Sequence, residues 1–263
     1  MADLKGRTVL VTGGNSGIGL AIAQRLAREG AGILLSGIVA QDEGNAASAQ
    51  LAATHGVVAR YLRADMRVPA EIEQLIRQAE QHGGGAIDIL VNNAGMQHTS
   101  AIESFPVDIW NDMVAVNLSA SFHTIRLCLP AMRARGWGRI VNVASISGLR
   151  GRAGKSAYNA TKHGLIGLTK AVALETADTA ITCNAICPGW AHTALVQRQV
   201  EALAQREQID VEAATRMLIS LRQPSGRFVR TEDLAAMVAF LCGEQAQEVR
   251  GAAWTMDGGT TAL

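Results

Sequence analysis

Residues 8–19 read Thr-Val-Leu-Val-Thr-Gly-Gly-Asn-Ser-Gly-Ile-Gly, a short apolar run that passes directly into a glycine-rich loop. A helical pattern follows to about Glu29, with Ile22 and Leu26 on one face. Glycines between a strand and a helix allow the backbone to approach a pyrophosphate, which the helix N-terminus then holds through its amide groups and dipole. This order of strand, loop and helix predicts a nucleotide-binding site.

The alternation of strand and helix continues along the 263-residue chain. Further strands are expected at residues 32–36, 57–64, 87–91, 139–144, 180–186 and 252–256. Helices are expected at residues 41–55, 69–82, 107–135 and 231–242, and polar helical sequence fills residues 193–222. The pattern predicts one α/β domain over residues 1–263, built on a doubly wound, Rossmann-type parallel sheet of about seven strands.

Five of the predicted strands end in residues suited to ligand binding: Gly13, Asp65, Asn92, Ser145 and Pro188. In an open α/β sheet, ligands bind in the crevice outside the carboxyl ends of the strands. The convergence of these residues on the carboxyl ends predicts a single site at that edge of the sheet.

Residues 145–162 carry the candidate catalytic groups. Tyr158 and Lys162 are four residues apart, so on a helix they share one face, and Ser145 ends the preceding strand with a hydroxyl that can bond a reacting oxygen. A phenol has a pKa near ~10, and a cation at roughly 6 Å in an effective dielectric of about 20 favours the phenolate by about 2.8 kcal/mol, or ~2 pKa units. A second cation, such as an oxidised nicotinamide, can bring Tyr158 into the range of general acid–base catalysis. Taken alone, the pair is also typical of a solvated helix face.

Composition narrows the class of protein. The chain has 24 basic and 23 acidic residues, so no basic surface indicates a nucleic-acid or membrane partner. We expect a cytoplasmic protein, because neither a signal-peptide pattern nor a membrane-spanning apolar run is present. Four cysteines without Cys-x-x-Cys pairing indicate free thiols, and six scattered histidines give no metal-ligand spacing.

These motifs resemble those of the short-chain dehydrogenase/reductase family over essentially the whole chain. The matching residues stand in order and at family spacing: Thr12-Gly-x-x-x-Gly-x-Gly19, Asn92-Asn-Ala-Gly95, Asn117, Ser145, Tyr158-x-x-x-Lys162 and Pro188-Gly189. One of these motifs alone is weak, but six in register are specific. The resemblance implies an oxidoreductase with a nicotinamide cofactor.

The family also implies a role for each matching residue. Tyr158 would be the acid/base, Ser145 would position the substrate oxygen, and Lys162 would hold the nicotinamide ribose and lower the pKa of Tyr158. Asn117 would distort its helix to hold a water in a proton relay, Asp65 would contact the adenine, Asn92 would lie along the cofactor and Thr193 would bind the carboxamide. The full set of implied cofactor contacts is Gly13, Asn15, Ser16, Gly17, Ile18, Gly19, Asp65, Met66, Asn92, Ala94, Gly95, Tyr158, Lys162, Pro188, Gly189 and Thr193.

Within the family, the chain is similar to the bacterial D-3-hydroxybutyrate dehydrogenases. Matching segments include Gly95-Met-Gln-His98, Lys155-Ser-Ala-Tyr158 and Asn184-Ala-Ile-Cys-Pro-Gly-Trp190. This similarity implies hydride transfer between the cofactor and a short (R)-3-hydroxy acid. The implied substrate residues are Gln97, Ser145, Ser147, Lys155, Tyr158, Trp190 and Gln199.

Two departures from that group leave the substrate open. Ser147 replaces a histidine that helps to hold the carboxylate, and Thr260 replaces a tryptophan that narrows the pocket, so both replacements are smaller. Arg150 and Arg152 add charge to the loop, where they supply another cation or point into solvent. The alternatives are a dehydrogenase for a bulkier or uncharged secondary alcohol, and a nucleotide-binding regulator without catalysis, which the intact catalytic set disfavours.

Cofactor type and assembly complete the expectations. NADP-preferring relatives usually place a cation in the glycine loop or after the second strand, whereas this chain has Asn15 and Ser16 in the loop and residues 37–39 are Gly-Ile-Val. With neither a cation nor a ribose-binding acid there, NAD is expected. The family forms subunit contacts through elements that resemble the helix from Val107, the Tyr158 helix and the last strand, which implies a homotetramer. Residues 193–222 would form a substrate lid.

Overall fold

Seven parallel strands form the centre of the molecule, in the order β3-β2-β1-β4-β5-β6-β7. The computed structural model describes residues 3–220 and 222–263. The strands are β1 (Thr8–Thr12), β2 (Gly32–Gly37), β3 (Ala59–Arg63), β4 (Ile89–Asn92), β5 (Gly138–Val143), β6 (Ile181–Pro188) and β7 (Ala253–Met256). The strand order reverses between β1 and β4, which is where doubly wound sheets bind their ligands.

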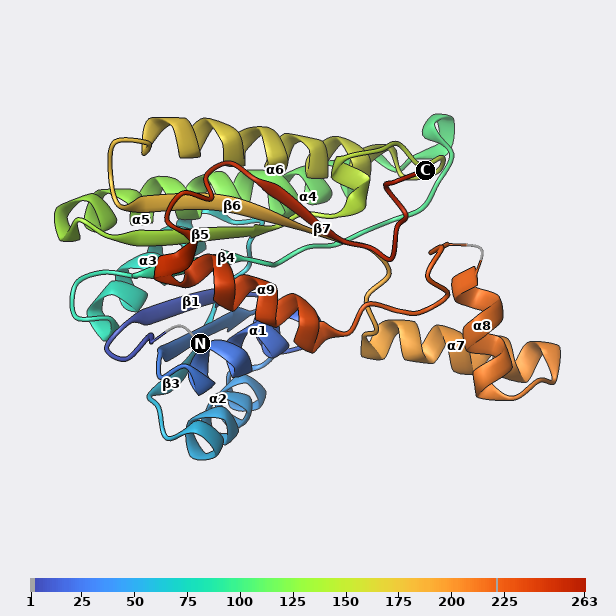
Figure 1. The fold of residues 1–263 in the computed structure, drawn as a ribbon, viewed down its shortest axis with the longest axis horizontal. Helices are drawn as coiled ribbons and strands as arrows, with labels where there is room; N and C mark the ends of the chain where they lie inside the picture. Colours follow the sequence, from blue (N-terminus) through green and yellow to red (C-terminus); the bar gives the residue numbers. More distant parts are fainter. Residues whose placement is uncertain (1–2, 221) are drawn as a thin grey trace.

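Helices cover both faces of the sheet (Figure 1). One face carries α1 (Gly17–Arg28), α2 (Gln41–His55) and α9 (Thr231–Cys242). The other carries α3 (Pro69–His82), α4 (Val107–Val114), α5 (Ala120–Arg135) and α6 (Ser156–Glu175). Two helices lie apart from the sheet, near the carboxyl ends of the strands: α7 (Ala194–Glu207) and α8 (Val211–Ser220) (Figure 1). Short helical segments are η1 (Ile102–Ser104), η2 (Ala115–Ser119), η3 (Ile146–Gly148) and η4 (Glu244–Ala246).

The alternation of side chains along the strands builds two cores. On β1, Val9 and Val11 join the core under α1 and α9, whereas Leu10 joins the core on the opposite face. Successive side chains of a strand point to opposite faces, and helices cover both faces here. Consecutive apolar residues are therefore buried in β1 and β4, which explains the continuous apolar runs in their sequence.

The structure confirms the predicted fold class, and it changes several boundaries. The helix predicted over residues 107–135 is interrupted by the π-helical segment η2. The predicted segment 193–222 divides in two, because Gln208 takes a left-handed conformation with φ 55° and Asp210 Oδ1 accepts a hydrogen bond from the amide of Ala213 at 2.6 Å. Residues 1–2 and Leu221, which the predicted domain and lid include, lie outside the described residues.

In residues 3–220 and 222–263, no helix is both long enough and apolar enough to cross a membrane.

Candidate active site

Ser145 lies where β5 ends and the loop to α6 begins. It is the N-terminal cap of η3, and its Oγ accepts a hydrogen bond from the amide of Ser147 at 3.1 Å. The loop then packs closely on α6, since a Cβ atom on Gly148 would lie 2.6 Å from the carbonyl oxygen of Lys162. Only a glycine permits this approach. The loop therefore holds Ser145 beside Tyr158 of α6.

Lys162 is buried under that loop, with 4% of its surface exposed. Its Nζ donates to the carbonyl oxygen of Val143, the last residue of β5, at 2.8 Å. The same Nζ atom lies 5.7 Å from the centre of the Tyr158 ring, close to the separation that the sequence predicts for neighbours on one helix face. The strand end thus holds the ammonium group below the phenol.

The two pKa values show what burial does to this pair. Burial lowers the pKa of Lys162 to about 8, and the nearby Cys187 opposes the shift. Burial also raises the pKa of Tyr158, and a hydrogen bond with the Ser145 side chain opposes that shift. Burial therefore sets the direction of this shift in the protein without its cofactor, and the lowering of the pKa of Tyr158 implied for Lys162 stays a prediction.

Asn117 lies in the π-helical segment η2, as predicted from its expected effect on the helix. Its side chain is buried and bonds the backbone of Met96 twice, accepting from the amide at 2.8 Å and donating to the carbonyl at 2.9 Å. It also donates to Thr161 Oγ1 at 3.3 Å, one residue before Lys162. Asn117 therefore joins the loop after β4 to the catalytic helix.

A cavity of about 420 Å³ extends from Tyr158 towards the glycine loop. Seven of the predicted cofactor residues line it: Ile18, Gly95, Tyr158, Lys162, Pro188, Gly189 and Thr193. Sequence reasoning missed Asn93 and Met96, which also line it. Their place in the sequence could have identified them, because both lie between Asn92, which begins the family motif, and Gln97, a predicted substrate residue.

Asn92 does not lie along this cavity, which corrects the prediction. Its side chain is 4% exposed and turns into the protein, where it donates to Asn142 Oδ1 at 2.9 Å and accepts from Thr124 Oγ1 at 2.7 Å. The next residue takes the predicted place. Asn93 lines the cavity and donates to the carbonyl oxygens of Thr12 and Gly13 at 3.0 and 2.9 Å, which fixes the start of the glycine loop.

The other predicted cofactor residues lie around this cavity without lining it. Gly13, Asn15, Ser16, Gly17 and Gly19 form the turn from β1 into α1, with Ser16 at the helix N-cap. The amide of Ala94 donates to Thr12 Oγ1 at 3.0 Å, and Met66 is buried behind the end of β3.

Asp65 already has a partner. Its carboxylate pairs with Arg67 at 2.6 Å, and the hydrogen bonds from Arg67 lower the pKa of Asp65. Arg67 also pairs with Asp112 of α4 at 3.1 Å. Through Arg67, α4 therefore helps to position Asp65, the residue for which the family implies contact with the adenine.

A second cavity of about 620 Å³ adjoins the first at Ser145 and Tyr158. All seven predicted substrate residues line it: Gln97, Ser145, Ser147, Lys155, Tyr158, Trp190 and Gln199. The Nζ of Lys155 donates to Gln97 Oε1 at 3.2 Å, so these two polar groups are adjacent. Burial lowers the pKa of Lys155, and the charge of Arg152 lowers it further.

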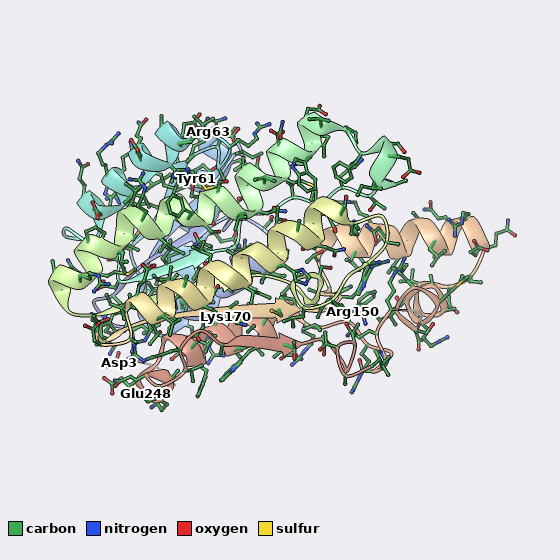
Figure 2. The ribbon with its side chains drawn as sticks, turned by 90° about the horizontal axis from the view of Figure 1, so that it is seen from above. Asp3, Tyr61, Arg63, Arg150, Lys170 and Glu248 are labelled. Atoms are coloured by element: carbon green, nitrogen blue, oxygen red, sulfur yellow. The ribbon has the colours of Figure 1, made fainter. Side chains whose placement is uncertain are left out.

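Basic side chains dominate the wall of this cavity. Arg150, Arg152 and Arg222 line it together with Lys155, and among the described lining residues none is acidic. Figure 2 shows Arg150 in the half of the molecule that carries α7 and α8. Arg222 was not predicted as a substrate residue. It is the last residue of the predicted helical segment 193–222, and nothing in the local sequence distinguishes it from a surface arginine.

Thr260 does not line the cavity, which corrects its predicted effect on the pocket. It is 1% exposed, its Oγ1 donates to the carbonyl oxygen of Asp257 at 2.6 Å, and its own carbonyl accepts from Arg150 Nη1 at 2.6 Å. Of the two small replacements, only Ser147 faces the substrate cavity.

Comparison with known proteins agrees with this geometry. The sequence profile described as short chain dehydrogenase matches residues 7–204. D-beta-hydroxybutyrate dehydrogenase of Cupriavidus necator is 54% identical over 259 residues, covering 98% of this chain and 99% of that protein. The enzyme of the same name from Rhizobium meliloti is 44% identical, covering 97% of this chain and 99% of its own. The chain belongs to the short-chain dehydrogenase/reductase family.

Solved structures give the same result. L-sorbose reductase from Gluconobacter frateurii, in complex with NADPH and L-sorbose, has a TM-score of 0.94 and 31% identity over 99% of both chains. A variant of actinorhodin polyketide ketoreductase with NADPH has a TM-score of 0.89 and 37% identity over the whole of both chains. This short-chain dehydrogenase is thus an oxidoreductase that uses a nicotinamide cofactor.

The residues present fit such a cofactor. A turn of glycines leads into the N-terminus of α1, where amide groups and the helix dipole suit a pyrophosphate. Lys162, Thr193 and the chain around Gly95 line the adjoining cavity next to Tyr158. The cavity therefore extends from the start of α1 to Tyr158.

The end of β2 lies beside the glycine loop. A Cβ atom on Gly37 would lie 2.5 Å from Asn15 Oδ1, so a larger residue at 37 would displace Asn15. Across the sheet, Gly37 pairs in register with Arg63, and the charge of Arg63 opposes the rise that burial causes in the pKa of Tyr61 (Figure 2). Sequence reasoning found no cation here because Arg63 comes from a different strand.

Proposed function

We propose that this short-chain dehydrogenase uses NAD to interconvert a short (R)-3-hydroxy acid and its 3-oxo acid, such as 3-hydroxybutyrate and acetoacetate. The observation that supports this most strongly is Lys155 beside Gln97, in the same cavity as Ser145 and Tyr158. A cation and an amide next to an acid/base pair suit a substrate that carries both a carboxylate and a carbinol. The names of the relatives in Cupriavidus necator and Rhizobium meliloti point to the same substrate.

The chemistry divides between the cofactor and the chain. The bound nicotinamide supplies the hydride acceptor for the carbinol hydrogen. Tyr158 takes the hydroxyl proton, and Ser145 bonds the oxygen on which charge develops. The cationic Lys162 below the phenol, together with the positive charge of the oxidised cofactor, offsets the desolvation that raises the pKa of Tyr158.

The carboxylate sets the orientation of the substrate. Lys155 and Gln97 would hold it from the loop side, and Gln199 of α7 would approach when α7 and α8 close over the cavity. Charge-assisted hydrogen bonds of this kind are short and directional, so they place the carbinol against Tyr158.

The preference for NAD belongs to this proposal. Asn15 occupies the space beside Gly37, and its amide suits a ribose hydroxyl rather than a phosphate. Two structural relatives were solved with NADPH, and Arg63 lies beside Gly37, so the cofactor requires a direct test.

A second candidate is a dehydrogenase for a bulkier or uncharged secondary alcohol. The small Ser147 side chain and the cavity of about 620 Å³ favour it. The third interpretation, a regulator without catalysis, has less support, because Ser145, Tyr158 and Lys162 lie together at the cavities.

A substrate panel separates these candidates. Initial rates would be measured with NAD and with NADP on 3-hydroxy and 2-hydroxy acids of four to eight carbons, and on the matching methyl esters. We expect the highest kcat/KM with NAD and a four- or five-carbon (R)-3-hydroxy acid, with the five-carbon acid used at least as well as the four-carbon acid. Esters or longer neutral alcohols used better than any acid would favour the second candidate. No turnover on any of them would favour the third.

Assembly and location complete the proposal. We infer a homotetramer, because apolar side chains are exposed on α4, α5 and α6 and again on α9 beside β7. We place the protein in the cytoplasm, where its four buried cysteines, all free thiols in the structure, would stay reduced.

A further inference from the structure

The substrate cavity contains more positive charge than one carboxylate needs. Lys155 and Gln97 account for the proposed carboxylate site. Arg152 and Arg222 lie elsewhere on the wall, and both guanidinium groups sit over the ring of Trp190, at 5.6 and 4.3 Å from its centre. Like charges that share one ring repel each other, and burial together with the charge of Arg152 lowers the pKa of Arg222.

Trp190 is a fixed platform for these two arginines. Its amide donates to Gln223 Oε1 at 2.9 Å, and its carbonyl accepts from the amide of Val229 at 2.9 Å. Because both groups are bonded, the backbone of Trp190 is held at the wall of the cavity that Trp190 lines. Cation–π contact then holds each guanidinium against its face.

Arg222 is fixed as firmly as the ring. Its Nη1 donates to the carbonyl of Leu218 at 2.9 Å, its amide donates to Ile219 at 2.8 Å, and its own carbonyl accepts from Thr260 Oγ1 at 3.4 Å. Of its guanidinium nitrogens, Nη1 makes the recorded contact with Leu218, and Arg222 lines the cavity. Arg150 also donates from Nη1 to a backbone carbonyl, that of Thr260, but among the described residues the guanidinium groups over the Trp190 ring are those of Arg152 and Arg222.

A second anion bound between Arg152 and Arg222 would offset the repulsion between their guanidinium groups. Guanidinium groups bind carboxylates through paired N–H donors, and among the described lining residues the cavity offers no acidic side chain to take that place. We propose that Arg152 and Arg222 on Trp190 form a second carboxylate subsite, so that the enzyme acts on short 3-hydroxy dicarboxylic acids. This inference rests on the proposed function, and it names a narrower substrate class for the same site.

The reaction balances as for a monocarboxylic acid. The carbinol C–H bond breaks with hydride transfer to NAD, the O–H bond breaks with proton transfer to Tyr158 and on to solvent, and the products are a 3-oxo dicarboxylate, NADH and a proton. The second carboxylate only binds. Because the rate is read as NADH formed, later decarboxylation of the 3-oxo product does not disturb it.

The test compares two substrates of equal length. 3-Hydroxypentanoate carries one carboxylate and 3-hydroxypentanedioate carries two. The variants are Arg152→Gln, Arg222→Gln and, as a control, Arg216→Gln, which removes a cation of α8 that pairs with Glu212 outside the cavity. We expect wild type to use the diacid at least as well as the monoacid. Each pocket variant should lower kcat/KM for the diacid at least about tenfold, mainly through KM, and change the monoacid less than about threefold.

Three outcomes would overturn the subsite. In wild type, kcat/KM for the diacid could be more than about tenfold below that for the monoacid. A pocket variant could lower kcat/KM equally for both substrates. Arg216→Gln could lower kcat/KM for the diacid as much as the pocket variants do. Turnover of the monoacid alone would reject the subsite and keep the proposed function.

A binding measurement keeps the two proposals separate. Pentanedioate and pentanoate have no carbinol, so their stabilisation of the enzyme against thermal unfolding does not depend on turnover. We expect stronger stabilisation by pentanedioate, lost in Arg222→Gln and kept in Arg216→Gln. If neither hydroxy acid is oxidised, the proposed function fails, and this comparison still decides whether the subsite binds a diacid. Equal stabilisation of wild type and Arg222→Gln by pentanedioate would reject it.

Discussion

The Nζ of Lys162 lies 5.7 Å from the centre of the Tyr158 ring, and it is held there by the carbonyl of Val143 at 2.8 Å. The relationship places a cation under the phenol without a direct bond between them. Since burial alone raises the pKa of Tyr158, the pair is set for catalysis only when the oxidised cofactor adds its charge. Tyr158 should then act as base in the cofactor complex and stay protonated without it.

Replacement of Tyr158 by phenylalanine tests its role as the proton acceptor. The ring remains, but the exchangeable proton is lost, so kcat should fall at least about 100-fold. Cofactor affinity, measured by fluorescence titration with NADH, should change little. Turnover above about a tenth of the wild-type value would remove Tyr158 from the mechanism.

The pKa of Lys162 predicts a pH effect on stability. Burial lowers it from 10.5 to about 8, so between these values the unfolded chain holds a proton that the folded chain has lost. The contribution of Lys162 to the free energy of unfolding therefore rises between pH 8 and pH 10.5, by about 3 kcal/mol in total. Below pH 8 the full cost of burying the charged ammonium group is present.

Urea unfolding of wild type and Lys162→Met at pH 7 and at pH 10 isolates this contribution. Burial also raises the pKa values of the thiols of Cys128, Cys183 and Cys242, which lowers stability at high pH, but equally in both proteins because Lys162 does not contribute to these shifts. Burial raises the pKa of Cys187 and the charge of Lys162 opposes that rise, so Cys187→Ala is introduced into both proteins for this comparison. The free energy of unfolding of wild type minus that of the variant should be larger at pH 10 than at pH 7. A difference independent of pH would show that Lys162 is not desolvated.

Cofactor choice is the third prediction. With Asn15 beside Gly37, kcat/KM with NAD should exceed that with NADP at least about tenfold, which corresponds to about 1.4 kcal/mol of lost charge pairing. Arg63→Ser should lower the residual activity with NADP and leave that with NAD unchanged, since Arg63 is the cation in register with Gly37. Equal efficiency with the two cofactors in wild type would contradict the NAD proposal.

Assembly is the fourth prediction. Light scattering should give about 111 kDa, four times the 27.7 kDa chain. Phe122→Glu places a charge among the exposed apolar residues of α4 and α5 and should lower the mass, whereas Val58→Glu, also at an exposed apolar residue but just before β3, should not. A wild-type monomer would contradict the proposed tetramer.

Local signals in the sequence were sufficient for most of the fold. Pro69 at the first turn and Gly83 after the last set the limits of α3, and the apolar run of β1 is bounded by glycine. Contacts between distant segments were not accessible in the same way. Gln208 gives no sequence sign of the left-handed turn that divides α7 from α8, because that conformation depends on how the two helices pack.

The candidate site follows the same division. Motif spacing placed Ser145, Tyr158 and Lys162 together, since one strand end and one helix carry them. It assigned Asn92 to the cofactor, although buried partners on α5 and β5 turn that side chain inward and leave Asn93 at the cavity. Burial of the phenol, which raises the pKa of Tyr158, depends on packing and could not be read from spacing.

Lys155→Ala tests the central claim, that the enzyme positions a 3-hydroxy acid through its carboxylate. The measurement is kcat/KM for (R)-3-hydroxybutyrate and for its methyl ester in wild type, in Lys155→Ala and in Lys170→Ala. Lys155 is the N-cap of α6, and Lys170 is a control within that helix but outside the cavity (Figure 2). Loss of one partner of a desolvated pair costs on the order of 2–5 kcal/mol, so Lys155→Ala should lower the value for the acid at least about thirtyfold. The ester should change less than about threefold, and Lys170→Ala should change neither. Equal losses for acid and ester, or no loss for the acid, would contradict the account.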